Sequence, residues 1–422
     1  MTEVGGTTPP TSAVARGSVA RVGAATALSA ACGYAVVYLA ARDLSPVGYS
    51  VFAVFWGAFG LVTGAANGLL QETTRAIRSI RYGTPAPGRV TRPLRVAALV
   101  GVAAAVAVAG SAPLWGTSVF VEQRGLSTAL LSVGLAGFCL HATLLGLLAG
   151  ANRWAQYGAL MVTDAAIRVA VAVATFVLGW SLAGFLWATV AGALAWLAIL
   201  IASPATRAAA RLLIPEGTAK FLRGAAHSVT AAGASAILVM GFPVLLKMTA
   251  GELGAEGGVV ILAVTLTRAP LLVPLTALQG NLIAHFVDEG AKRLRALITP
   301  AALIVGFSAV GVVAAASVGP WLLRAAFGPD YRAGGALLAG LTAAAGAIAV
   351  LTLTGAAAVA AALHRAYALG WVGATVASTL LLLLPAPVDV GARTVIALLC
   401  GPVVGIAVHL AALTRAGPDN SR

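Results

Sequence analysis

The sequence predicts an all-α integral membrane protein with about twelve transmembrane helices in two lobes of six. Apolar residues make up 60% of the chain and charged residues 9%, whereas ordinary soluble domains have roughly 45–50% and about 25%. Runs of the roughly 20 apolar residues needed to cross about 30 Å of hydrocarbon recur along nearly the whole chain. The membrane is therefore the solvent of this protein.

Apolar runs separated by polar residues or Gly/Pro breaks define the expected helices. The run that follows the polar first seventeen residues is too long for a signal-peptide core, so we expect the first span to be retained. The predicted spans cover residues 19–41, 50–70, 94–114, 127–150, 156–178, 182–202, 226–248, 258–284, 297–316, 334–362, 366–384 and 394–414.

The distribution of Lys and Arg predicts the orientation. With a cytoplasmic N-terminus, the inner loops carry 19 of the 27 basic residues and the outer loops carry 6, while Arg168 and Arg268 lie within spans. Because basic loops stay on the cytoplasmic side, both termini are predicted to be cytoplasmic.

Two weak internal echoes predict a duplicated chain. Residues 41–54 resemble residues 250–264 at an offset of 209, and residues 152–158 resemble residues 364–370 at an offset of 212. We therefore expect a cytoplasmic tail (1–18), a first lobe (19–202), a cytoplasmic linker (203–225), a second lobe (226–414) and a short tail (415–422). An even number of helices in each half predicts a parallel repeat.

Several classes of function are disfavoured. The net charge of +14 sits in short loops between spans, which disfavours nucleic-acid binding. The three cysteines and five histidines show no metal-ligand spacing, no P-loop motif occurs, and we expect no cofactor. No outer loop is long enough for a catalytic domain, so an enzyme, such as a membrane glycosyltransferase or polymerase, ranks behind a transporter.

Arg268 is the leading candidate for a binding residue. It lies near the middle of the eighth span, in AVTLTRAPLLVP, with no acid within four residues. A charge at this depth almost always faces a partner or a wet cavity. It is either a structural contact to carbonyls or a carboxylate of another helix, or a cationic cavity group that binds phosphate oxygens. Pro270 and Pro274 on the same helix predict a bend.

The other candidates for the substrate cavity are polar residues in or near the spans. Arg168 follows Asp164 by one helical turn, and the favoured interpretation of this pair is an internal salt bridge. A polar mouth toward the cytoplasm is predicted from residues at the inner ends of the first, second and eighth spans, although snorkelling explains Arg21 and Arg75 equally well: Arg21, Asn67, Gln71, Arg75, Gln279 and Asn281.

Four segments resemble polysaccharide-biosynthesis flippases of the multidrug/oligosaccharidyl-lipid/polysaccharide (MOP) exporter superfamily. The likeness covers essentially the whole chain, and its motifs mark the superfamily better than the substrate. It is carried by ARDLSPVGYSVFAVFWGAFGLVTGAANGLLQETTR at 41–75, GANRWAQYGAL at 150–160, TRAPLLVPLTALQGNLIAHFVDEG at 267–290 and FGPDYRAGGALLAGL at 327–341.

The resemblance implies two six-helix lobes in a V around a cationic cavity lined by the first, second, seventh and eighth helices. It also implies an undecaprenyl-diphosphate-linked saccharide with an anionic head as substrate, alternating access in the cytoplasmic membrane, and partner proteins of polysaccharide assembly. The alternative is a cation-coupled small-molecule or drug antiporter of the same superfamily. Such exporters typically carry buried acids, and Asp164, already provided with Arg168, is the only deep acid here.

Overall fold

The computed structural model describes residues 11–79, 90–384 and 389–416, which are helical apart from turns and one isolated antiparallel bridge between Thr91 and Ile214. The first half contains α1 (Thr11–Asp43), α2 (Pro46–Ser79), α3 (Pro93–Val119), α4 (Arg124–Gly150), α5 (Trp154–Leu178), α6 (Ser181–Ala191), the 3-10 turn η1 (Gly192–Leu194), α7 (Ala195–Ala202) and α8 (Pro204–Ala210). The second half contains α9 (Thr218–Val239), α10 (Phe242–Ala250), α11 (Gly254–Asp288), the 3-10 turn η2 (Gly290–Lys292), α12 (Arg293–Ala296), α13 (Ile298–Ser317), α14 (Gly319–Phe327), α15 (Gly335–Ala360), α16 (His364–Leu383) and α17 (Val390–Arg415).

Each predicted span has a helical counterpart, so the predicted fold class is confirmed. Among the described residues, eleven helical segments are long and apolar enough to cross a membrane, and the bent pair α9 and α10 brings the total to twelve. The protein is therefore a multi-pass membrane protein.

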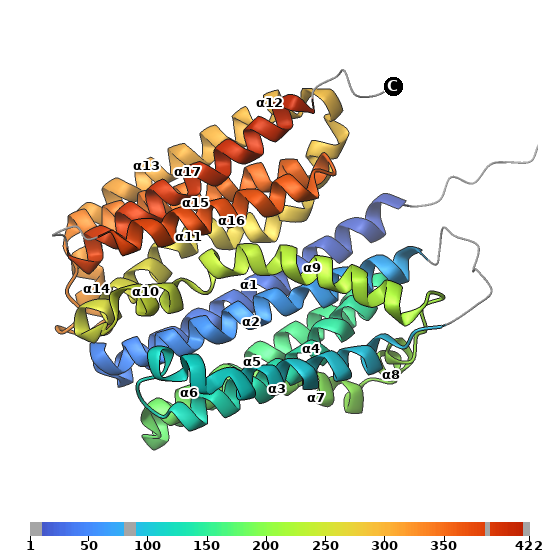
Figure 1. The fold of residues 1–422 in the computed structure, drawn as a ribbon, viewed down its shortest axis with the longest axis horizontal. Helices are drawn as coiled ribbons and strands as arrows, with labels where there is room; N and C mark the ends of the chain where they lie inside the picture. Colours follow the sequence, from blue (N-terminus) through green and yellow to red (C-terminus); the bar gives the residue numbers. More distant parts are fainter. Residues whose placement is uncertain (1–10, 80–89, 385–388, 417–422) are drawn as a thin grey trace, which may run out of the picture.

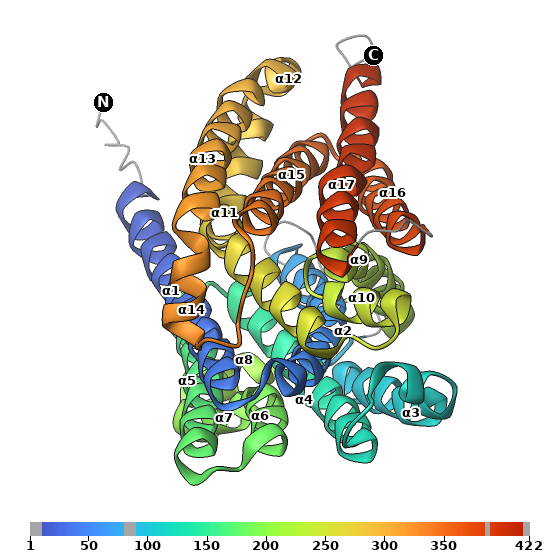
Figure 2. The same cartoon turned by 90° about the vertical axis from the view of Figure 1, so that its left-hand side faces the viewer.

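The helices form two groups with α9 and α10 between them (Figures 1 and 2). In the first group α1 packs on α5, and α4 packs on α2 and α3. In the second group α15 packs on α11, α13 and α17, and α16 packs on α17. Helix α9 contacts both α2 and α16 and so joins the groups. Helix α1 begins, and α17 ends, at the same end of the bundle, which we call the inner side (Figure 1).

The seventh span is broken, which the sequence analysis did not predict. A single helix was expected over residues 226–248, but α9 starts earlier, at Thr218, and meets α10 at an angle of 62°. The break falls at Met240 and Gly241, and Pro243 occupies the first turn of α10. Proline has no amide hydrogen and clashes with the preceding helical turn, so the helix ends just before it.

Two helix-to-helix turns support an internal duplication. Asn152, between α4 and α5, and Ala362, between α15 and α16, have φ angles of 57° and 58°. In both turns, successive amides bond back to the end of the preceding helix in the same pattern. These equivalent residues are 210 positions apart. The sequence echo predicted an offset of 212, so the two turns align two residues away from the predicted alignment. The backbone of the turn repeats more faithfully than its sequence.

On the outer side, two of the segments that carry the family resemblance meet. The Tyr331 hydroxyl, in the loop after α14, donates a hydrogen bond of 3.1 Å to the carbonyl of Leu44, between α1 and α2. Burial and the neighbouring Asp330 carboxylate raise the pKa of Tyr331, so the hydroxyl keeps the proton that it donates. Gly328 precedes it with a φ of 106°, a conformation that glycine adopts readily. The contact joins the outer ends of the two lobes.

On the inner side, the predicted linker is partly helical and bound to the first lobe. It contains α8, the bridge to Thr91 and the first turns of α9. Arg75 near the end of α2 pairs with Glu72 and lies 3.7 Å from Glu216 of the linker, which in turn pairs with Lys220 at 3.1 Å. These ion pairs hold the inner end of α9 against α2.

The outer contact leads to a prediction about opening. Tyr331→Phe removes a hydrogen bond worth about 1 kcal/mol, which favours separation of the outer ends by about fivefold. In a cysteine-free background, Ala30→Cys places a thiol on the wall of the chamber described below. Its labelling by a membrane-impermeant thiol reagent added from the outer side should accelerate by that factor.

Tyr38→Phe is the matched control for this experiment. The Tyr38 ring packs against Phe327 at 5.6 Å, and its hydroxyl bonds to none of the described residues. Equal labelling rates in Tyr331→Phe, Tyr38→Phe and the parent would show that the hydrogen bond does not restrain opening.

Candidate functional site: a chamber at the broken helix

A chamber of about 340 Å³ lies where the two lobes meet, beside the break between α9 and α10. Its walls come from α1, α2, α9, α10 and α11, which are the first, second, seventh and eighth predicted spans. This matches the set of helices that the family resemblance implied. The chamber volume is at the lower end of the range for ligand sites.

Arg268 reaches the chamber from the middle of α11 and is the one charged residue in its described lining. Its side chain is buried, with 7% exposed. The nitrogen Nη1 donates to the carbonyl of Val239 at 3.0 Å and to that of Leu238 at 3.4 Å. Nη2 has no hydrogen-bond partner among the residues that the structure describes. The guanidinium is therefore anchored at one end and unpaired at the other.

The break in the seventh span explains the anchored end. In an α-helix the carbonyl of Val239 would accept from the amide of residue 243, but that residue is Pro243 and has no N–H. The Leu238 carbonyl loses its partner because the chain turns after Val239. These two carbonyls, left without amide partners, form the negative end of the α9 dipole, which favours a cation. Arg268 occupies this position in place of the missing amides.

Aromatic groups complete the surroundings of Arg268. The Phe242 ring, at the start of α10, lies with its centroid 5.4 Å from the guanidinium carbon, within the range of a cation–π interaction. Tyr34 of α1 lines the chamber and interacts electrostatically with Arg268. The described lining contains no Asp or Glu. The chamber therefore offers one cation and no balancing anion.

Arg168 and Asp164 lie in the first lobe, outside the chamber lining. Arg168 bonds to Oδ1 of Asp164 through Nε at 3.1 Å and Nη2 at 3.0 Å, so the predicted internal salt bridge is confirmed. The guanidinium also lies 5.6 Å from the centroid of the Phe59 ring. The Asp164 carboxylate packs against Gly192, at the 3-10 turn of the sixth span. This close contact requires glycine, because a Cβ at position 192 would overlap the carboxylate.

The structure does not gather the predicted inner mouth around Arg268. Arg21 and Gln71 are exposed, Asn67 is half-buried, and Arg75 is held by Glu72. None of these four lines the chamber. Gln279 and Asn281 fall within α11, but their side chains lie outside the described part of the structure. Whether these residues bind substrate stays a prediction.

Tyr34, Phe242 and Pro243 were missed by the sequence analysis. Each sits in an apolar run whose hydropathy hides its role. The one available signal was Gly241 with Pro243 two residues later, since glycine and proline are the residues that most often interrupt a helix.

Comparison with solved structures places the fold. The chain is similar to a multidrug resistance MATE family transporter of the MOP superfamily in its inward-facing conformation, with a TM-score of 0.69, 14% identity and coverage of 92% of this chain and 95% of that one. The chain is also similar to a MATE in its bent conformation, with a TM-score of 0.63, 14% identity and coverage of 95% of this chain and 96% of that one. For a MOP superfamily transporter from Pyrococcus furiosus the TM-score is 0.62 and the identity 12%, with coverage of 97% of this chain and 99% of that one. The protein therefore has the fold of MATE-type transporters of the MOP superfamily.

Sequence comparison identifies the family. No family model matches the chain. Uncharacterized proteins of Mycobacterium bovis and Mycobacterium tuberculosis are 71% identical over 423 residues, which cover 98% of this chain and 98% of theirs. A further Mycobacterium tuberculosis protein is 69% identical over 415 residues, covering 98% of this chain and 96% of its own. The chain belongs to the same family as these mycobacterial proteins.

The anchoring of Arg268 leads to a prediction about stability. Arg268→Gln leaves the partly buried Val239 carbonyl without a donor, which should cost about 1–3 kcal/mol. Pro243→Ala returns an amide hydrogen to that position. The loss caused by Arg268→Gln should therefore be smaller in the Pro243→Ala background, as measured by thermal unfolding in detergent. Equal losses in both backgrounds would refute the proposed origin of the anchor.

Proposed function

We propose that the protein is a flippase that carries a lipid-linked saccharide with an anionic diphosphate head across the cytoplasmic membrane by alternating access. The observation that carries this proposal is the Arg268 guanidinium, which reaches a mid-membrane chamber with no carboxylate partner and with Nη2 unpaired. A buried cation of this kind calls for an anionic partner.

The chemistry of guanidinium favours phosphate as that partner. Guanidinium stays charged at any physiological pH and offers several N–H donors in a plane, which matches phosphate oxygens. Nη1 is used by backbone carbonyls, and Nη2, which is buried and has no partner among the described residues, is the donor left for a ligand. The chamber accommodates the diphosphate end, and the saccharide extends beyond it toward the inner side.

The absence of a free acid argues against a cationic substrate. The described lining of the chamber has no Asp or Glu, and two acids of the described spans, the buried Glu72 and the half-buried Asp164, are each paired with an arginine. A cationic drug would meet only the like charge of Arg268. A structural neighbour from Pyrococcus furiosus is described as having a binding pocket of reverse polarity that suggests a different function. This fold is thus compatible with pockets of more than one polarity.

Translocation in reconstituted vesicles tests the proposal. Arg268→Gln should lower both the affinity for an undecaprenyl-diphosphate-linked saccharide and its rate of translocation by about tenfold or more, since a hydrogen bond to a charged group contributes roughly 1.5–3 kcal/mol. Arg268→Lys should retain part of the activity because it keeps the charge but not the planar donors. The readout is protection of a fluorescent saccharide from a quencher outside the vesicles.

The matched control removes the other intramembrane arginine together with its partner. Asp164→Asn with Arg168→Gln deletes both charges of the half-buried pair and leaves neither unpaired. This double variant should translocate at close to the normal rate. Unchanged transport by Arg268→Gln would overturn the site. Proton-driven movement of a cationic dye without movement of the saccharide would support the antiporter instead.

A further inference from the structure

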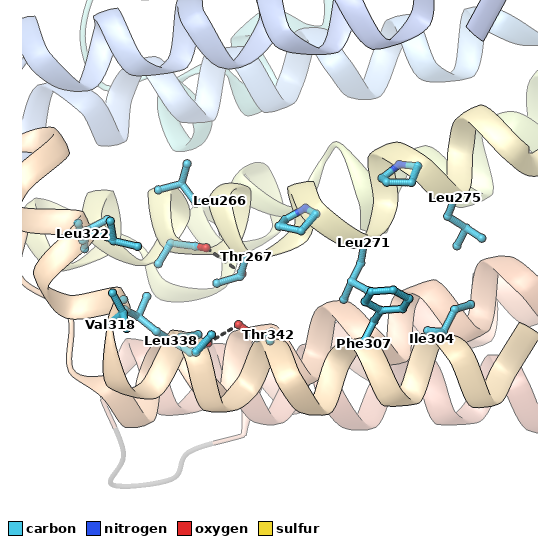
Figure 3. A pocket seen from close by; sticks show the side chains of 18 of the residues that line it. Leu266, Thr267, Leu271, Leu275, Ile304, Phe307, Val318, Leu322, Leu338 and Thr342 are labelled. Carbon is cyan, nitrogen blue, oxygen red and sulfur yellow. Dashed lines mark hydrogen bonds between the residues drawn. The ribbon is translucent and has the colours of Figure 1, made fainter. Parts of the chain in front are cut away.

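A long apolar groove runs between α11 and α13, on a part of α11 that faces away from the chamber (Figure 3). Its volume is about 890 Å³, α15 forms its floor and α14 closes its outer end. Leu271 of α11 and Phe307 of α13 extend into it from opposite walls (Figure 3). The groove is thus much larger than the chamber beside Arg268.

The walls of the groove suit a hydrocarbon and little else. Its described lining has no charged residue, and its hydroxyl groups belong to Thr267 and Thr342. Both hydroxyls donate to carbonyls of their own helices, Thr267 to Ala263 and Thr342 to Leu338, each at 2.8 Å. The groove therefore offers no free side-chain donor to a polar ligand. It lies along spans that cross the bilayer, where the available ligands are lipid chains.

The length of the groove selects among lipid chains. Its lining runs from Leu303 on α13 to Val318, just after that helix, and from Ala263 to Leu278 on α11. At 1.5 Å rise per residue, each wall is about 22 Å long. One leaflet supplies about half of the roughly 30 Å hydrocarbon thickness. The groove is thus longer than the leaflet that confines an ordinary acyl chain, and it fits a chain that extends past mid-membrane.

The groove and the chamber share one helix. Along α11, Thr267 and Leu271 line the groove. The residues that follow them, Arg268 and Leu272, line the chamber. A ligand bound on both sides would be held at its anionic head and along its chain. We propose that the groove binds the polyprenyl chain of the carrier lipid, an inference that rests on the proposed function.

Binding of two lipid phosphates of different chain length tests this proposal. The probes are undecaprenyl phosphate and farnesyl phosphate, which share the head group, and affinity is measured in detergent by competition with a fluorescent polyprenyl phosphate. The parent protein should bind the long chain at least about tenfold more tightly, because each buried methylene adds to affinity. Ala314→Trp fills the groove and should abolish this preference, because it lowers the affinity for undecaprenyl phosphate much more than the affinity for farnesyl phosphate.

The control and a second variant make the result specific. Val313→Trp lies on the same helix outside the groove lining, with Val313 69% exposed, and should keep the preference. Leu271→Trp blocks the groove from the opposite wall and should act like Ala314→Trp, so poor folding of one variant does not decide the test. Retention of the preference in both blocking variants would overturn the groove assignment.

Arg268→Gln separates this inference from the proposed function. It should weaken both probes by the same factor and preserve the preference for the long chain. Loss of the preference in the groove variants, with no effect of Arg268→Gln, would keep the groove and overturn the head-group site. If neither probe binds the parent protein more tightly than phosphatidylglycerol, both the groove proposal and the proposed carrier are wrong.

Discussion

The centre of the protein depends on stabilising one arginine in the middle of a membrane. An isolated charge in hydrocarbon is costly, and no carboxylate approaches Arg268 among the described residues. Compensation comes from backbone carbonyls that a broken helix has left without donors. The two defects offset each other: the break needs a donor and the arginine needs acceptors. Removing either one leaves the other uncompensated.

Two other arginines on the membrane-spanning helices are stabilised differently. Arg168 and Arg75 each have a carboxylate on their own helix, within one turn. Such local pairs neutralise both charges and leave little field for a ligand. Arg268 has carbonyl dipoles, which stabilise the positive charge without cancelling it. A cation that is stabilised but not neutralised keeps its attraction for an anion, which is why this residue differs from the others as a candidate site.

Sequence patterns predicted the spans well and the site only in part. Hydropathy located every span because membrane insertion is a property of local composition. It could not show the break in the seventh span, since Met240, Gly241 and Phe242 are as apolar as a continuous helix requires. Arg268 was found because a lone charge stands out in an apolar run. Tyr34 and Phe242 were not, because their roles depend on contacts between helices distant in sequence.

The break also distinguishes the two halves of the fold. Helix α1 runs without interruption from Thr11 to Asp43, whereas the corresponding first span of the second half is divided into α9 and α10. Helix α9 packs so closely on α2 that its backbone at Val229 leaves no room for a side chain at Gly68. Helix α9 also contacts α16. Helix α10 meets α9 at 62° and packs on both α2 and α16, so the break lies within the contact between the two groups. Arg268 bonds to the last carbonyls before this break. The break that interrupts the seventh span is therefore also the feature that gives the buried guanidinium its acceptors.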